Sequence, residues 1–303
     1  MKSFTLNIAD YDIRFISTGP ETDLFFKKKY NHFYSCSENP DITVRVFSGI
    51  VEPEEKAVRV FHAPYIKETE NKKVKISDEF WTVYKNKNDI LIETILPLGK
   101  KNRKASLRMN AGEDEWDLYI SGADKKKDPL EYPLDGLMLY YLTVRSGDIF
   151  IHGSGVNINN RGYLFAGVSG KGKTTIAQLW DKAGATVIHD DRLIIRNIND
   201  RFVMYNTPVY NNETQRSSPV DKIFLIDHGT ANSIAPTGKS EALSLVMANC
   251  IQHLWDPSII ESLTEALVKL TSETDTCRLF FKPDNSVISY ILEEWNKGNR
   301  GNN

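Results

Sequence analysis

The chain contains the stretch GVSGKGKT, beginning at Gly167, whose residue types and spacing can hold phosphate groups. Because a glycine has no Cβ, Gly167, Gly170 and Gly172 let the backbone approach a ligand closely. Successive amide N–H groups can then point inward and form an anion site at the start of a helix. Lys173 can supply positive charge to the β- and γ-phosphates, and the Thr174 hydroxyl can ligate Mg²⁺. The stretch therefore predicts a nucleotide-binding loop.

The flanking residues strengthen this prediction. An apolar stretch, YLFAGV, leads into the loop, and a stretch with helical spacing, TTIAQLW, follows it. This strand–loop–helix context is the one in which the pattern binds phosphate, whereas a glycine-rich turn without a ligand is the alternative. We expect Ser169, Lys171 and Thr175 to belong to the same ATP or GTP site, although Lys171 also suits an exposed position without a role.

Two neighbouring acids, Asp190 and Asp191, end the apolar stretch ATVIHDD downstream of the loop. Strand ends beside a phosphate-binding loop are where α/β proteins place residues that handle ligands. One carboxylate can hold Mg²⁺, which offsets the repulsion between two adjacent negative charges. The other can accept the proton of an attacking hydroxyl, as phosphoryl transfer requires. A turn or helix cap is the alternative role for such a pair.

Residues 1–130 have a strand-like pattern. In DITVRVF, apolar and polar residues alternate with period two. Two further stretches, EFWTVYKNKNDILIETIL and KASLRMNAGEDEWDLYIS, each predict a pair of strands joined by a polar turn. The lysines at 125–127, followed by Asp128 and Pro129, are expected to form a solvated connector. We therefore predict a β-rich domain over 1–130, which recognises an acceptor or partner.

Residues 131–303 alternate between strand-like and helix-like stretches. Strands are predicted in FIHGSGVNI, GYLFAGV, ATVIHDD, KIFLIDHG and CRLFFKPD, with a hairpin in RLIIRNINDRFVMYN. Helical spacing occurs in DGLMLYYLTVRSG, TTIAQLWDKAG, SEALSLVMANCIQHLW, PSIIESLTEALVKL and SVISYILEEW. Alternating strands and helices predict an α/β layer, and the hairpin favours a mixed sheet over a purely parallel one. We predict that 131–303 form a nucleotide-binding domain.

Composition narrows the classes of function. The 303 residues are 41% hydrophobic and 26% charged, with a formal net charge of −2, as in globular proteins. The near-neutral balance argues against nucleic acid or an anionic membrane as a partner. No apolar stretch approaches the roughly 20 residues that span a bilayer, and we expect no signal peptide. Three widely spaced cysteines indicate neither a disulfide framework nor a zinc site, so we expect a cytoplasmic protein.

His152 lies in FIHGSGV, one strand upstream of the loop. A lone histidine is more often structural than a ligand, and His189, His228 and His253 carry no prediction. In order, FIHGSGV, YLFAGVSGKGKTT and VIHDDR resemble the HPr kinase/phosphorylase family and its relative, phosphoenolpyruvate carboxykinase. Both have a GxSGxGK[ST] loop, an upstream strand carrying His and a downstream strand ending in paired aspartates. The resemblance is close from Phe150 to Arg192.

This resemblance implies a mixed-sheet core of the carboxykinase and HPr-kinase type that binds ATP or GTP. In such a core Lys173 and Thr174 serve the nucleotide and Mg²⁺. Asp190 and Asp191 share base and metal duties, and His152 assists at the phosphate or the metal. The implied reaction moves the γ-phosphoryl group to a hydroxyl of a protein, peptide or small molecule, and an assembly of identical subunits is also implied.

Departures from the family pattern bear on the acceptor. HPr kinases usually have an acidic residue after the loop hydroxyl, whereas this chain has Thr175, as carboxykinases do. The stretch NTPVYNNETQRSSPVDKIF stands where HPr kinases carry a glycine-rich signature. Two alternatives therefore stay open, namely a regulatory module that binds nucleotide without catalysis and, less in keeping with the length, a carboxykinase-like enzyme.

Overall fold

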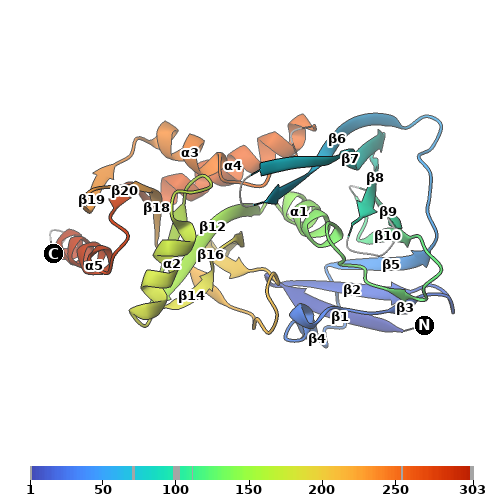
Figure 1. The fold of residues 1–303 in the computed structure, drawn as a ribbon, viewed down its shortest axis with the longest axis horizontal. Helices are drawn as coiled ribbons and strands as arrows, with labels where there is room; N and C mark the ends of the chain where they lie inside the picture. Colours follow the sequence, from blue (N-terminus) through green and yellow to red (C-terminus); the bar gives the residue numbers. More distant parts are fainter. Residues whose placement is uncertain (1, 70–71, 98–102, 111, 254, 301–303) are drawn as a thin grey trace. The chain divides into compact units, whose positions relative to one another are not determined.

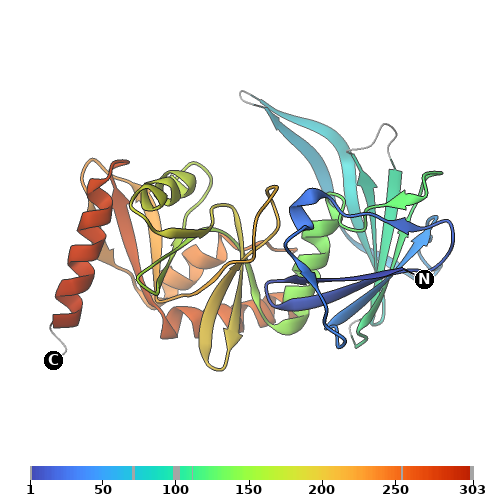
Figure 2. The ribbon, with the colours of Figure 1, turned by 90° about the horizontal axis from the view of Figure 1, so that it is seen from below.

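The chain divides into two compact units (Figures 1 and 2). The computed structural model describes residues 2–69, 72–97, 103–110, 112–253 and 255–300. Unit 1 comprises Met1–Tyr141 and Tyr210–Thr214, and unit 2 comprises Leu142–Val209 and Gln215–Asn303.

Unit 1 is built on a nine-stranded sheet with the order β4-β1-β2-β5-β10-β9-β8-β7-β6. Its strands are β1 (Ser3–Ile8), β2 (Tyr11–Ser17), β4 (Tyr34–Ser35), β5 (Ile42–Ser48), β6 (Val58–Thr69), β7 (Lys72–Asn86), β8 (Asp89–Leu96), β9 (Arg103–Asn110) and β10 (Glu115–Ile120). A 3-10 helix spans Lys28–Tyr30, and the short strands β3 (Asp23–Leu24) and β11 (Lys126–Lys127) pair in parallel. The two predicted strand pairs are confirmed as the antiparallel pairs β7–β8 and β9–β10, although residue 111 of the second turn lies outside the described part.

The solvated connector predicted at 125–129 is wrong from Lys127 onward, although Lys125 and Lys126 are exposed as expected. Lys127 is fully buried, and its ammonium donates hydrogen bonds to the carbonyl oxygens of Ser121 (3.3 Å) and Gly122 (2.7 Å). Asp128 is also buried, with one carboxylate oxygen 3.7 Å from the Lys27 ammonium. A run of charges is usually solvated, and the sequence alone did not reveal the backbone carbonyls that satisfy this buried lysine.

Unit 2 contains a second nine-stranded sheet, which is mixed. Its path is β17-β16-β15-β12-β13-β18-β20-β19, and β14 also pairs with β12. The strands are β12 (Ile149–Ile158), β13 (Arg161–Ala166), β14 (Thr186–His189), β15 (Arg192–Ile198), β16 (Arg201–Asn206), β17 (Ser217–Pro219), β18 (Lys222–His228), β19 (Ser233–Pro236) and β20 (Asp275–Phe281). Strands β13, β18 and β20 run parallel, whereas β12 is antiparallel to β13. The predicted mixed α/β architecture is therefore confirmed.

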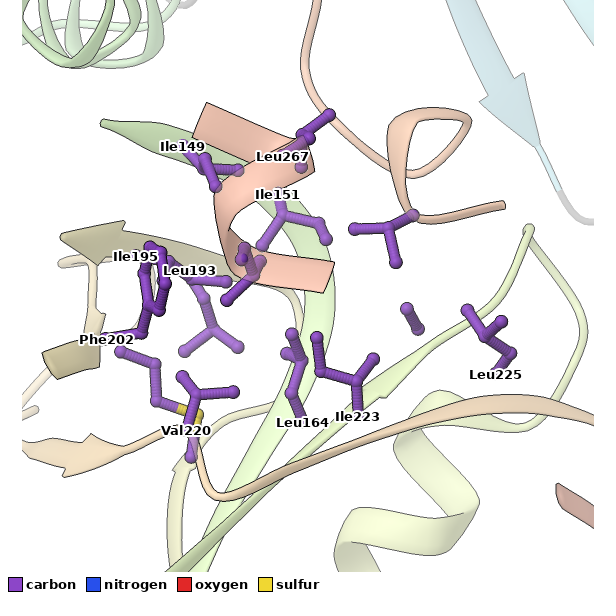
Figure 3. Close-up of a cluster of buried hydrophobic side chains, with 14 of the residues drawn as sticks. Ile149, Ile151, Leu164, Leu193, Ile195, Phe202, Val220, Ile223, Leu225 and Leu267 are labelled. Atoms are coloured by element: carbon purple, nitrogen blue, oxygen red, sulfur yellow. The ribbon is translucent and has the colours of Figure 1, made fainter. Parts of the chain in front are cut away.

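Helices pack against both faces of the parallel strands in unit 2. The helices of the chain are α1 (Leu134–Ser146), α2 (Lys173–Lys182), α3 (Lys239–Met247), α4 (Pro257–Glu273) and α5 (Ser286–Arg300). On one face Phe165 packs in a core with Trp180 of α2 and Ile288 of α5. On the other face Leu164 packs in a core with Leu267 of α4 (Figure 3). Successive residues of β13 thus serve two cores, as the alternation of a strand requires. None of the described helices is long and apolar enough to cross a membrane.

One predicted helix is shorter than expected. The pattern predicted helix over 240–255, but α3 ends at Met247, and residue 254 lies outside the described part. The segment after α3 instead runs beside β12: Ile251 N–H donates to the Phe150 carbonyl and His152 N–H donates to the Asn249 carbonyl, both at 2.8 Å. These bonds satisfy backbone groups that a longer helix would have satisfied internally.

Candidate functional site

The residues 167–173, hereafter the glycine-rich loop, connect β13 to α2. Gly170 and Gly172 have φ angles of 86° and 92°, in the left-handed region that favours glycine. A Cβ at Gly172 would also lie 2.8 Å from Cζ of Phe281, at the end of β20. A Cβ at Gly167 would lie 2.9 Å from Cγ1 of Ile226, near the end of β18. The loop therefore packs against the carboxyl ends of β18, the parallel neighbour of β13, and of β20, the parallel strand beyond β18. This is the edge where α/β sheets bind ligands.

The first turn of α2 presents polar groups beside this loop. Gly172 is the N-cap residue, and no side chain of the described residues caps the helix. The N–H groups of a first helical turn have no intrahelical partner and favour an anion. Thr174 is exposed in this turn and Thr175 is half-buried, while Ser169 is exposed in the loop.

Lys173 folds back onto the loop. Its ammonium donates to the Gly167 carbonyl at 2.5 Å. Burial lowers the pKa of Lys173, and the negative charge of Asp191 opposes that shift. The charge of Asp191 therefore acts electrostatically on Lys173, although Asp191 follows β14 and Lys173 begins α2.

Asp190 and Asp191 follow the end of β14, as predicted, and they separate two strands that pair with the same neighbour. Strand β14 stops at His189 and β15 starts at Arg192, and both pair antiparallel with β12. The buried His189 ring turns the backbone here, because its Nδ1 accepts hydrogen bonds from the N–H of Asp191 (2.9 Å) and of Arg192 (3.1 Å). A single histidine in a sequence does not predict that its ring accepts backbone hydrogen bonds. The sequence therefore did not indicate this role for His189.

His152 contacts this aspartate turn from β12. Its Nδ1 lies 3.4 Å from Oδ1 of Asp191, and Nε of Arg192 lies 3.6 Å from Oδ2. The His152 ring and then the Arg192 charge lower the pKa of Asp191, against the effect of burial. Asp191 is thus held as a carboxylate. The half-buried Asp190 carboxylate has no hydrogen-bond or ion-pair partner among the described residues.

Three consecutive residues of β12 join the aspartate turn to the helix start. His152 contacts the Asp191 side chain, and Gly153 N–H donates to the Asp191 carbonyl at 3.1 Å. The fully buried Ser154 hydroxyl donates to the Lys173 carbonyl at 3.0 Å. Alternation along β12 places His152 and Ser154 on one face, the face that packs against α2. The predicted residues His152, Asp191 and Lys173 therefore lie together.

The structure adds two residues that the sequence interpretation missed. Asp227 and His228 end β18, which pairs in parallel with β13. The Lys171 ammonium donates to Asp227 at 2.7 Å, and His228 Nε2 lies 2.9 Å from the Gly170 carbonyl. The signal available in the sequence was the apolar run KIFLI ending in an acid, since a carboxylate at the end of a strand next to the loop strand lies at the ligand edge.

The oxygen donors of the site suit one metal in particular. Among the described residues, no group of three or more His, Cys, Asp or Glu could hold a metal ion. Mg²⁺ does not need such a group, because it binds through one or two carboxylates plus water and substrate phosphates. The exposed hydroxyl of Thr174 and the ionised Asp191 fit this donor set.

Compared with known proteins, the chain matches no protein-family model and no curated protein sequence. The likeness of residues 150–192 to a kinase family therefore depends on its motifs, and the function of the chain on the geometry of the site.

Proposed function

We propose that the chain is an ATP-dependent phosphotransferase with a nucleotide-binding core of the HPr-kinase and carboxykinase type. The observation that supports this most strongly is the single strand, β12, that contacts both the aspartate turn and the start of α2. A glycine-rich turn without a ligand has no need of an ionised aspartate whose charge acts on its lysine. Bringing phosphate-binding and proton-accepting groups together is the main requirement of phosphoryl transfer.

In this proposal the glycine-rich loop and α2 bind the phosphates of ATP or GTP. The first-turn N–H groups favour the negative charge, and Lys173 exchanges the Gly167 carbonyl for a phosphate oxygen. Ser169, Lys171 and Thr175 complete the loop side of the site. Mg²⁺ held by Thr174 and an aspartate would neutralise charge on the phosphates.

The two aspartates take different roles. The lowered pKa of Asp191 makes it a weak base but a good partner for cations, so we assign Asp191 to the metal side. The Asp190 carboxylate has no competing partner among the described residues. We therefore assign Asp190 as the general base that accepts the proton of the attacking hydroxyl. In this proposal His152 orients Asp191 and assists in binding the phosphate.

The acceptor in this proposal is a hydroxyl group of a protein, peptide or small molecule, selected with the help of the β-rich unit. We place the enzyme in a reducing cytoplasm, because Cys36, Cys250 and Cys277 form no disulfide. Self-association is part of the proposal on the family resemblance alone, and neither nucleic acid nor a membrane is a partner in it.

Water can replace the unidentified acceptor in a first test of the chemistry. We expect the wild type to release phosphate slowly from ATP in the presence of Mg²⁺. Asp190→Asn should release it at least about 100-fold more slowly, the lower range for losing a general base, while still binding nucleotide. Binding by the wild type without any Mg²⁺-dependent release, or an unchanged rate in Asp190→Asn, would contradict the catalytic assignment and favour a nucleotide-binding switch.

A further inference from the structure

The carboxyl end of β18 contacts the tip of the glycine-rich loop through two consecutive side chains. Asp227 accepts a hydrogen bond from the Lys171 ammonium at 2.7 Å. His228 Nε2 lies 2.9 Å from the Gly170 carbonyl, and because a carbonyl only accepts, this ring nitrogen must carry the proton. Asp227 also accepts the backbone N–H of His228 at 2.7 Å, so the two side chains are fixed to each other.

The loop tip itself is a tight turn in which the Lys171 N–H donates to the Val168 carbonyl at 3.2 Å. Gly170 is exposed and in the left-handed region, a conformation with a high cost in chain entropy when it is ordered. Contacts from a strand can order the loop before the ligand binds. They then reduce the entropic cost of ordering the loop during binding. The contacts from β18 reach the tip at Gly170 and at the neighbouring Lys171.

We propose that Asp227 and His228 are positioning residues of the nucleotide site, which hold the glycine-rich loop in the conformation that receives phosphates. The inference rests on the proposed nucleotide binding and extends it to a strand outside the resembling segment. Both residues act through the loop, via Lys171 and Gly170.

The electrostatic attraction between Lys171 and Asp227 is too weak to be the main contribution of this pair. Both side chains are about one-third exposed, so solvent screens their attraction, and the pair adds little as a surface ion pair. A carboxylate beside a phosphate site would repel the ligand, but the pair is neutral as a whole. Removing both charges therefore leaves the net charge of the site unchanged, and the His228 variants test the positioning role without changing a residue of the proposed nucleotide site.

The test is calorimetric titration of MgATP into the wild type and matched variants. The double variant Lys171→Ala/Asp227→Ala should bind about tenfold more weakly, as should His228→Leu, which corresponds to about 1.4 kcal/mol. His228→Gln keeps an N–H donor and should recover binding to within about threefold of the wild type. The control is Lys222→Ala/Asp275→Ala, which removes a 2.6 Å ion pair at the other end of β18 and should leave affinity within about twofold.

The outcomes separate this inference from the proposed function. Wild-type affinity in Lys171→Ala/Asp227→Ala and His228→Leu would overturn the positioning role alone. Equal weakening in the control pair would also overturn it, because the loss would then reflect general stability. No binding of MgATP by the wild type would overturn the proposed function, and the positioning role with it.

Discussion

The Nδ1 of His152 lies 3.4 Å from Oδ1 of Asp191. This contact joins a residue upstream of the glycine-rich loop to one downstream of it, and it is made from the face of β12 that packs against α2. It keeps Asp191 ionised, and the same carboxylate acts electrostatically on Lys173. The histidine of the upstream strand thus has a structural role, which is to lower the pKa of an aspartate beside the loop lysine.

We expect His152→Ala to raise the pKa of Asp191 toward its ordinary value. The hydrogen bond from the His152 side chain is the largest influence that lowers this pKa. A lowered pKa stabilises the fold above the unfolded-state value, and that stability is lost as pH falls through the folded value. The variant should therefore lose less stability in acid.

An NMR titration of the Asp191 carboxyl carbon measures this shift directly. His152→Gln, which keeps a side-chain hydrogen-bond donor at this position, should give an Asp191 pKa between those of the wild type and His152→Ala. An Asp191 pKa that is the same in the wild type and in His152→Ala would mean that the contact does not set its charge state.

Gly172→Ala should destabilise the protein more than Gly170→Ala does. Both positions have positive φ, and a Cβ in this region costs about 1–2 kcal/mol. At Gly170 a Cβ would meet nothing within 4 Å, whereas at Gly172 it would lie 2.8 Å from the Phe281 ring. Urea unfolding should show a larger loss of stability in Gly172→Ala than in Gly170→Ala. When both changes are made in a Phe281→Leu background, the difference between the two losses should shrink. Equal losses would show that Phe281 does not restrict this position.

Ser154→Ala should lower the free energy of unfolding by about 1 kcal/mol, the usual contribution of one internal hydrogen bond. The Ser154 hydroxyl is fully buried and donates to the Lys173 carbonyl at 3.0 Å. The control is Ser244→Ala in α3, where an exposed hydroxyl donates to the Ser240 carbonyl at 2.9 Å, and its effect should stay within about 0.5 kcal/mol. Similar effects of the two changes on urea unfolding would argue that Ser154 does not hold α2 to β12.

Asp128 should make the wild type less stable as pH rises from 4 to 7. Burial raises the pKa of this carboxyl from 3.8 to about 6, so the folded state holds a proton that the unfolded state has lost. The stabilisation is complete below the unfolded value and disappears as pH rises through the folded value. A shift of this size corresponds to about 3 kcal/mol.

The variant Asp128→Asn isolates this effect, because it removes the titrating group while keeping its shape. Urea unfolding should show Asp128→Asn gaining stability relative to the wild type by roughly 2 kcal/mol between pH 4 and pH 7, because at pH 4 the unfolded state has already lost part of its proton. A constant difference between the two proteins would contradict the raised pKa.

Local sequence predicted the elements around the loop well. Period-two and helical patterns located β12, β13 and α2, because those elements bury alternate or one-sided faces. The motif spacing predicted that Gly170 and Gly172 give the loop its backbone conformation. The structure shows positive φ angles at both positions, which favour glycine. Spacing alone would not have placed His152 beside Asp191, and the sequence interpretation grouped them only through the family resemblance.

The features that the sequence did not predict depend on contacts between distant segments. Asp227 and His228 reach the loop only because β18 pairs in parallel with β13. Lys127 is buried because carbonyl groups of Ser121 and Gly122 replace water around its ammonium. Helix α3 ends early because the chain after it hydrogen-bonds with β12. In each case the tertiary partner outweighs the local pattern.

The most direct test of nucleotide binding is calorimetric titration of MgATP and MgGTP into the wild type and Lys173→Ala. Lys182→Ala, an exposed change in the last turn of α2, is the control. We predict that the wild type and Lys182→Ala bind one of the nucleotides with the same affinity, and that Lys173→Ala binds it at least about 100-fold more weakly, or about 2.7 kcal/mol. No binding by the wild type, or equal binding by Lys173→Ala, would contradict a phosphate-binding role for the glycine-rich loop.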